Sequence, residues 1–133
     1  MQLNTYLTFS GNCKEAFEFY AKVLGGKIEA MFPHKGSPME AHTPPEWLDK
    51  IMHARMTVGD QVLMGSDAPR QYQTKPGGFS VNIGVKDPAE ADRIYAALSE
   101  GGQVKMPIGQ TFWAKRFAMF IDRFGIPWMI NCE

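Results

Sequence analysis

The sequence predicts an α+β fold made of two copies of one β-α-β-β-β module. Within its 133 residues, residues 5–21 align without a gap on residues 80–96. One inserted residue then brings the pair Gly25-Gly26 onto Gly101-Gly102. Each copy consists of a strand, a capped helix and a glycine turn, and one such unit by itself is too small to bury its apolar faces. We therefore expect the two copies to share one core.

The length is typical of one domain, and the repeat defines the boundaries of the two modules within it. The single domain spans 1–133, with a first module at about 1–68, a linker at about 69–78 and a second module at about 79–133. Hydrophobic residues make up 44% and charged residues 21%, with a formal net charge of zero, which is typical of a globular protein and excludes a disordered chain. Basic residues are scattered, so we expect no nucleic-acid partner.

Targeting and membrane signals are not found in the sequence. The first residues show no leader pattern, and no apolar run reaches the ~20 residues needed to span a bilayer. We therefore expect no membrane partner and a cytoplasmic location. Cys13 and Cys132 stand far apart without a metal-binding spacing, which favours two free thiols.

The first module begins with a β-prone run over residues 3–9. Asn12 with Glu15 has the capping-box spacing, so we expect Asn12 to cap a helix that ends at Gly25. The apolar positions of this helix recur at three- and four-residue steps: Ala16, Phe19, Tyr20, Val23 and Leu24. A strand over residues 27–32 follows.

The segment 33–50 is rich in proline and too long for a hairpin turn. It is either a solvated loop or a lid over a site, and Trp47 favours the lid. Strands are then expected at residues 51–58 and 61–64, around Gly59-Asp60. Alternation places His53, Arg55 and Thr57 on one face and the methionines on the other.

The second module repeats these signals after the linker. Asp87 is the expected N-cap, with Pro88 in the first helical position and Glu90 at the capping-box spacing. Strands are expected at residues 103–106, 114–121 and 126–132, with the last turn at 122–125. Both halves therefore read β-α-β-β-β.

Three segments resemble the PhnB-like branch of the vicinal oxygen chelate superfamily, which includes glyoxalases, extradiol dioxygenases and bleomycin-resistance proteins. They are residues 6–20, residues 52–56 with 63–67, and residues 120–128, and the resemblance extends over the whole chain. It implies the glyoxalase/bleomycin-resistance fold, in which two paired modules form a curled mixed sheet, a cup, with the helices outside. Some relatives are named as methyltransferases, but this chain lacks the glycine-rich turn and acidic residue of a nucleotide-type cofactor site.

The resemblance also implies where a metal would be bound. In metal-dependent relatives, a first-strand His or Gln and a last-strand Glu hold a divalent cation in the cup. Counting from the helix caps and final turns puts Thr5 and Ser80 at the first-strand positions and Met64 and Met129 at the last-strand positions. Hydroxyls and thioethers are neutral and bind such cations poorly. We therefore expect no metal and no other cofactor, with a divalent metal as the alternative.

Methionine and aromatic side chains suit a planar or greasy small molecule, although plain core packing would use the same residues. The expected pocket-lining residues are Thr5, Leu7, Phe9, Met64, Ser80, Asn82, Trp113 and Met129. Arg55, Lys115 and Arg116 are candidates for an anion contact.

Two classes of function follow. The first is a protein that binds a small organic molecule without a metal, as bleomycin-binding relatives do. The second is a lyase or dioxygenase-type enzyme whose chemistry has moved to His53 with Asp67, or to a metal held by Glu40 and His42. His53 is the best acid-base candidate, because histidine exchanges protons near neutral pH. A homodimer is also expected, because open sheet edges favour pairing.

Overall fold

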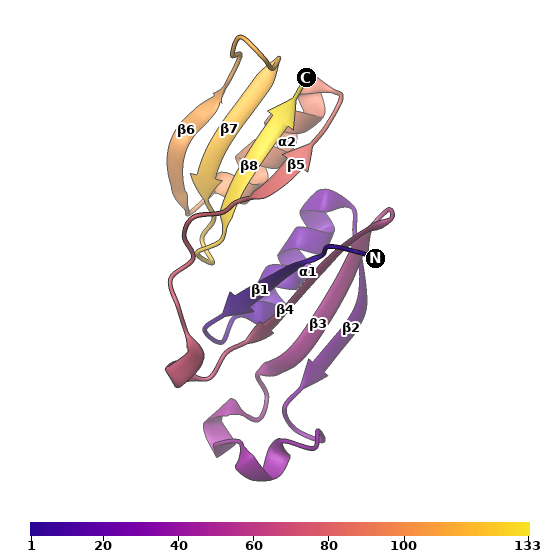
Figure 1. Ribbon diagram of the computed structural model, residues 1–133, viewed down its shortest axis with the longest axis vertical. Helices are drawn as coiled ribbons and strands as arrows, with labels where there is room; N and C mark the ends of the chain where they lie inside the picture. The colour runs from indigo at the N-terminus through magenta and orange to yellow at the C-terminus, as the bar shows by residue number, and fades with distance from the viewer. The chain divides into compact units, whose positions relative to one another are not determined.

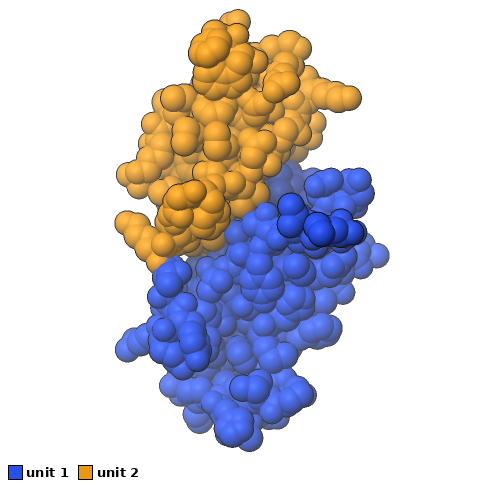
Figure 2. All heavy atoms as spheres, viewed as in Figure 1, with its two compact units in different colours: residues 1–74 blue, residues 75–133 orange.

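The computed structural model describes all 133 residues and divides into two compact units. Unit 1 is Met1–Thr74 and unit 2 is Lys75–Glu133 (Figure 2). The boundary falls within the predicted linker at 69–78. Each unit contains one α-helix and one four-stranded sheet (Figure 1), so the predicted α+β class and element order are confirmed. A core shared between the two copies stays a prediction.

Unit 1 contains the first β-α-β-β-β module. Its elements are β1 (Thr5–Phe9), α1 (Cys13–Leu24), β2 (Lys27–Pro33), β3 (Ile51–Val58) and β4 (Gln61–Asp67). The strand order is β1-β4-β3-β2, with β1 parallel to β4 and the other pairs antiparallel. Short 3-10 turns at Glu40–His42, Pro45–Trp47 and Arg70–Tyr72 lie outside the sheet.

Unit 2 repeats this topology. Its elements are β5 (Val81–Gly84), α2 (Pro88–Ser99), β6 (Gln103–Gly109), β7 (Arg116–Ile121) and β8 (Pro127–Cys132). The strand order is β5-β8-β7-β6, again with one parallel pair, β5 with β8. Neither α1 nor α2 has the length and apolarity that crossing a membrane requires.

The core of unit 1 lies between α1 and one face of the sheet. Leu7 and Phe9 of β1 are only 1% and 2% exposed, and the Phe9 ring meets the Phe17 ring of α1 edge-on. Gly65 of β4 permits this close packing, because a Cβ there would lie 2.9 Å from the Phe17 ring. Phe17 is the buried aromatic of the first helical turns, whereas Phe19, which we predicted in the stripe, is half-buried.

The start of α1 differs from the prediction. Asn12 makes no side-chain cap hydrogen bond. The backbone N–H groups of Gly11 and Cys13 instead donate to Asp67 Oδ1 at the end of β4, both at 2.9 Å. A buried carboxylate from a distant strand thus replaces the local cap, and the capping box at Asn12 is wrong.

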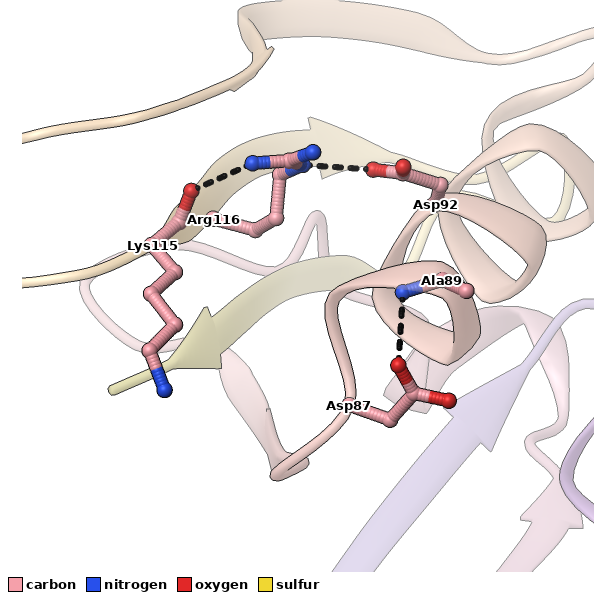
Figure 3. Close-up of polar contacts among 5 residues, drawn as sticks. All are labelled: Asp87, Ala89, Asp92, Lys115 and Arg116. Carbon is pink, nitrogen blue, oxygen red and sulfur yellow. Dashed lines mark hydrogen bonds and ion pairs between the residues drawn. The ribbon is translucent and has the colours of Figure 1, made fainter.

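The start of α2 and the end of α1 follow the sequence. The Asp87 carboxylate accepts a hydrogen bond from the backbone N–H of Ala89 at 3.0 Å and caps α2, as predicted (Figure 3). Gly25 ends α1 in the left-handed region at φ 69°, a conformation that glycine adopts without the steric cost of a Cβ.

Candidate functional site

Each sheet has one face that its own helix covers and one that it does not. We call the second the open face of that unit. Because side chains alternate along a strand, the buried residues identify the open face by elimination. These two open faces are where the expected site residues can be compared with the structure.

The open face of unit 2 is largely apolar. Met119 of β7 lies directly across from Met129 of β8, and Met129 lies across from Asn82 of β5. This face also includes Gly84, Gln103, Met106, Gly109, Phe117, Ile121, Pro127 and Asn131. A thioether pair beside an amide forms a surface that adapts to an irregular apolar ligand and offers it one polar edge.

An aromatic pair flanks this apolar surface. The Trp113 ring packs against the Phe117 ring with a centroid separation of 5.1 Å, and Phe117 is buried as a result. The Thr111 hydroxyl accepts a hydrogen bond from the backbone N–H of Ala114 at 3.1 Å, which fixes the turn that carries Trp113. Trp113 itself remains 46% exposed and therefore presents a flat surface to a ligand.

The open face of unit 1 is more polar. It includes Tyr6, Thr8, Lys27, Ala30, Phe32, His53, Arg55, Thr57, Val62, Met64 and Ser66. Tyr6 and His53 form a stacked pair whose ring centroids are 5.8 Å apart. The Tyr6 hydroxyl and His53 Nδ1 are within hydrogen-bonding distance at 3.3 Å. The predicted placement of His53, Arg55 and Thr57 on one face of β3 is confirmed.

Three of the expected pocket-lining residues lie on the wrong face. Leu7 and Phe9 are buried under α1, and Thr5 alternates with them on the covered face. Tyr6 and Thr8 occupy the open face of β1 instead. The more apolar side of the strand packs against the helix because that burial removes more apolar surface from water.

The remaining five lie on an open face or next to one in the chain. Met64, Asn82 and Met129 are on open faces. Trp113 stands in the loop before β7, and half-buried Ser80 immediately precedes β5. Tyr6, Phe117 and Met119 were missed by the sequence reasoning, although a period of two counted from the most apolar positions of each strand would have indicated them.

His53 and Asp67 do not form the expected pair. Asp67 is 3% exposed and accepts hydrogen bonds from the backbone N–H groups of Gly11, Cys13 and Ile51. It lies on the covered side of β4, whereas His53 lies on the open face of β3. Asp67 therefore holds the β1–α1 turn to the start of β3, and no proton relay with His53 is formed.

Burial also changes the pKa of the Cys13 thiol. Loss of solvation, with a further contribution from the Asp67 charge, raises the pKa of the Cys13 thiol to about 12. Thiolate is the reactive form of cysteine, so this thiol is a poor nucleophile. Cys132 is also buried and unpaired, so neither cysteine forms a disulfide.

Two of the three basic residues expected to contact an anion, Arg116 and Lys115, do not lie on an open face. Arg116 Nε donates to Asp92 on α2 at 3.0 Å, and Arg116 Nη1 donates to the Lys115 carbonyl at 2.8 Å (Figure 3). Arg116 therefore links the start of β7 to α2 on the covered face of the sheet. Lys115 is exposed and lies just before β7. Arg55 is the only one of the three on an open face.

The loop at 33–50 is ordered by its own turns. Glu40 Oε2 accepts a hydrogen bond from the Gly36 N–H at 3.2 Å, and His42 is exposed. Trp47 lies against the β1–α1 turn, because a Cβ built at Gly11 would stand 3.6 Å from its ring. A lid movement of this segment stays a prediction.

The side chains that β1, β4, β5 and β8 present on the open faces fit a divalent cation poorly. The residues of β1, β4, β5 and β8 that point to these faces carry phenol, hydroxyl, amide and thioether groups, and none carries a carboxylate. No group of three or more His, Cys, Asp or Glu side chains is placed to hold a metal ion. Catalytic divalent ions are usually held by carboxylate oxygens or imidazole nitrogens.

Two β-α-β-β-β units, each a helix on a mixed sheet with an open face, define the glyoxalase/bleomycin-resistance class of fold. Residues 2–130 match the family described as the Glyoxalase/Bleomycin resistance protein/Dioxygenase superfamily, and the chain belongs to this superfamily. The resemblance found in the sequence is thereby confirmed.

Three relatives illustrate the similarity. Protein YjdN of Escherichia coli (strain K12) is 30% identical, over 98% of this chain and 95% of that protein. The crystal structure of protein PA1353 from Pseudomonas aeruginosa is 51% identical with a TM-score of 0.92, covering 100% of this chain and 98% of that one. The PhnB protein from Bacillus cereus, described as a putative 3-demethylubiquinone-9 3-methyltransferase, is 22% identical with a TM-score of 0.83, covering 100% of both chains, and this likeness is one of fold.

Proposed function

We propose that this protein binds a small, flat, mainly apolar organic molecule on the open face of unit 2, and that it does so without the divalent cation of its metal-dependent relatives. The observation that carries the proposal is the surface formed by Met119 and Met129 beside the Trp113–Phe117 ring pair. Met106 extends the surface across to β6. Thioethers and ring faces make favourable contacts with a planar ligand, and Asn82 supplies a hydrogen-bonding edge.

A neutral fluorescent probe tests the binding proposal. N-phenyl-1-naphthylamine should bind the wild-type chain with enhanced emission, and the double variant M119S/M129S should weaken the affinity by about tenfold or more, because burial of each methylene group contributes about 0.8 kcal/mol. The matched control is M39S, which changes a 52%-exposed methionine in the 33–50 loop. Equal affinities for the double variant and the control would contradict the proposal.

Metal content is measured separately. Elemental analysis of protein purified without chelators should give well under one divalent ion per chain, and EDTA should leave the probe affinity unchanged. A stoichiometric ion whose removal abolishes probe binding would reject the metal-free part of the proposal while leaving the apolar binding surface in place.

A second candidate function is acid-base catalysis on a small carbonyl compound by the Tyr6–His53 pair. The specific observation is the 3.3 Å distance between the Tyr6 hydroxyl and His53 Nδ1, because a base held by a neighbouring hydroxyl is oriented for proton transfer. Turnover of methylglyoxal that is lost in H53Q and retained in H42Q would establish this function. His42 is the matched control because it is exposed and outside the sheet.

We also propose that the protein is a homodimer in the cytoplasm. The outermost strands, β1 and β2 in unit 1 and β5 and β6 in unit 2, each have one neighbour in their own sheet, and unpaired strand edges favour association. The two free thiols suit a reducing compartment. Light scattering should give the mass of two chains, and a mass of one chain at micromolar concentration would reject the dimer.

A further inference from the structure

Arg55 is an unpaired cation on the open face of unit 1. The structure gives its guanidinium no hydrogen-bond or ion-pair partner, although the side chain is half-buried. Its cross-strand neighbours are Met64 on β4 and Ala30 on β2, and neither carries a charged group or an oxygen that could pair with the guanidinium. A charge that gives up part of its hydration without a protein partner favours a ligand that supplies the opposite charge.

Two polar aromatic side chains lie near this cation. His53 is two residues from Arg55 along β3 and on the same face, which places the two side chains about 7 Å apart at their Cβ atoms. Tyr6 lies beyond Met64, on β1, and its hydroxyl reaches across to His53 Nδ1. Met64 therefore lies between Tyr6 and Arg55 across the sheet, and His53 is diagonal to it.

We propose that this surface binds the carboxylate of a small aromatic acid. Arg55 would hold the carboxylate through its planar fork, which matches two oxygens, and the stacked Tyr6 and His53 rings would contact the flat body of the ligand above Met64. One guanidinium matches one negative charge, which favours a carboxylate over a doubly charged phosphate. The acidic group in this region is Glu29 on β2, whose carboxylate accepts a hydrogen bond from the Thr57 hydroxyl at 3.2 Å. Glu29 limits the ligand to the Tyr6 side of Arg55.

Benzoate and its neutral analogue benzamide test this site on the full chain. Calorimetric titration of the wild-type protein should show benzoate binding at least about tenfold more tightly than benzamide, because hydrogen bonds to charged groups are the stronger kind. R55Q should reduce the ratio to about one, and R55K should retain part of it, because lysine keeps the charge and loses the fork. R70Q is the matched control, since Arg70 is exposed in the Arg70–Tyr72 turn.

Two sets of titration results support or contradict the Arg55 site. A tenfold preference that disappears in R55Q and persists in R70Q supports the site, and circular dichroism confirms that both variants are folded. No benzoate binding, no preference over benzamide, or a preference that R55Q retains would overturn it. Because the probe and the methionine variants of unit 2 are different, this inference can fail while the proposed function stands, and the reverse also holds.

Discussion

Asp67→Asn is the substitution that most directly tests how unit 1 is held together. Asp67 Oδ1 accepts from the N–H groups of Gly11 and Cys13, both at 2.9 Å, and Oδ2 accepts from Ile51 at 2.8 Å. These three donors come from the β1–α1 turn and the start of β3. An asparagine keeps one acceptor oxygen, and its amide nitrogen then faces a backbone donor across a buried contact.

The magnitude follows from these contacts. A hydrogen bond to a charged group contributes about 1.5–3 kcal/mol, and a buried donor left unsatisfied costs about 1–3 kcal/mol. Because D67N loses at least one bond and the charge on the others, we expect the free energy of unfolding to fall by about 2–4 kcal/mol. Urea unfolding at pH 7, followed by circular dichroism, measures this change.

Asp60→Asn provides the comparison. The exposed Asp60 accepts a hydrogen bond only from its neighbour Gln61, at 2.9 Å, so D60N should change the free energy of unfolding by no more than about 0.5 kcal/mol. If the D67N and D60N unfolding curves superimpose, the carboxylate does not hold the turn to the sheet, and our account of how α1 begins is refuted.

Three further predictions test the packing and the helix ends. Cys13 should resist 5,5′-dithiobis(2-nitrobenzoate) at pH 8 until urea is added, because its pKa is raised to about 12 from 9.0. Rapid labelling of native protein would contradict this resistance. Because the unfolded chain loses the thiol proton at a lower pH than the folded chain, the contribution of Cys13 to the free energy of unfolding is complete below pH 9 and falls as the pH rises toward 12. Gly65→Ala should lower the melting temperature by several degrees, because its Cβ would lie 2.9 Å from the Phe17 ring, whereas Gly84→Ala meets no atom within 4 Å and should have little effect. Asp87→Ala should lower the free energy of unfolding by about 1 kcal/mol through loss of the α2 cap, and an unchanged urea midpoint would show that the cap is not needed.

The sequence predicted the elements well where the signals were local. The α2 cap at Asp87, the αL residue at Gly25 and the hairpin strand at 51–58 all depend on neighbours within a few residues, and the structure has them as expected. The start of α1 depends on Asp67, more than 50 residues away, and a capping pattern at Asn12 contains no information about that contact. Long-range hydrogen bonds of this kind become visible only when the strands are paired.

The misplaced pocket-lining residues of β1 have one physical cause, a shift of one residue between the two halves. The gapless alignment pairs Leu7 with Asn82, yet Leu7 is buried under α1 and Asn82 is exposed on the open face. Because side chains alternate with a period of two, a one-residue shift within a strand exchanges its two faces. Helix caps therefore align the helices of a repeat correctly without fixing the faces of the strands that precede them.

This shift also bears on the metal ligands expected from the family. Strand pairing, rather than counting from the caps, shows that the open-face neighbour of Met64 is Tyr6 and that of Met129 is Asn82. The first-strand candidates thus change from Thr5 and Ser80 to a phenol and an amide. Both choices are neutral, so the mismatch with a divalent cation does not depend on the register. Our two binding proposals therefore rest on apolar contact in unit 2 and on the Arg55 guanidinium of the unit 1 open face, which is why their tests use a neutral probe and a carboxylate.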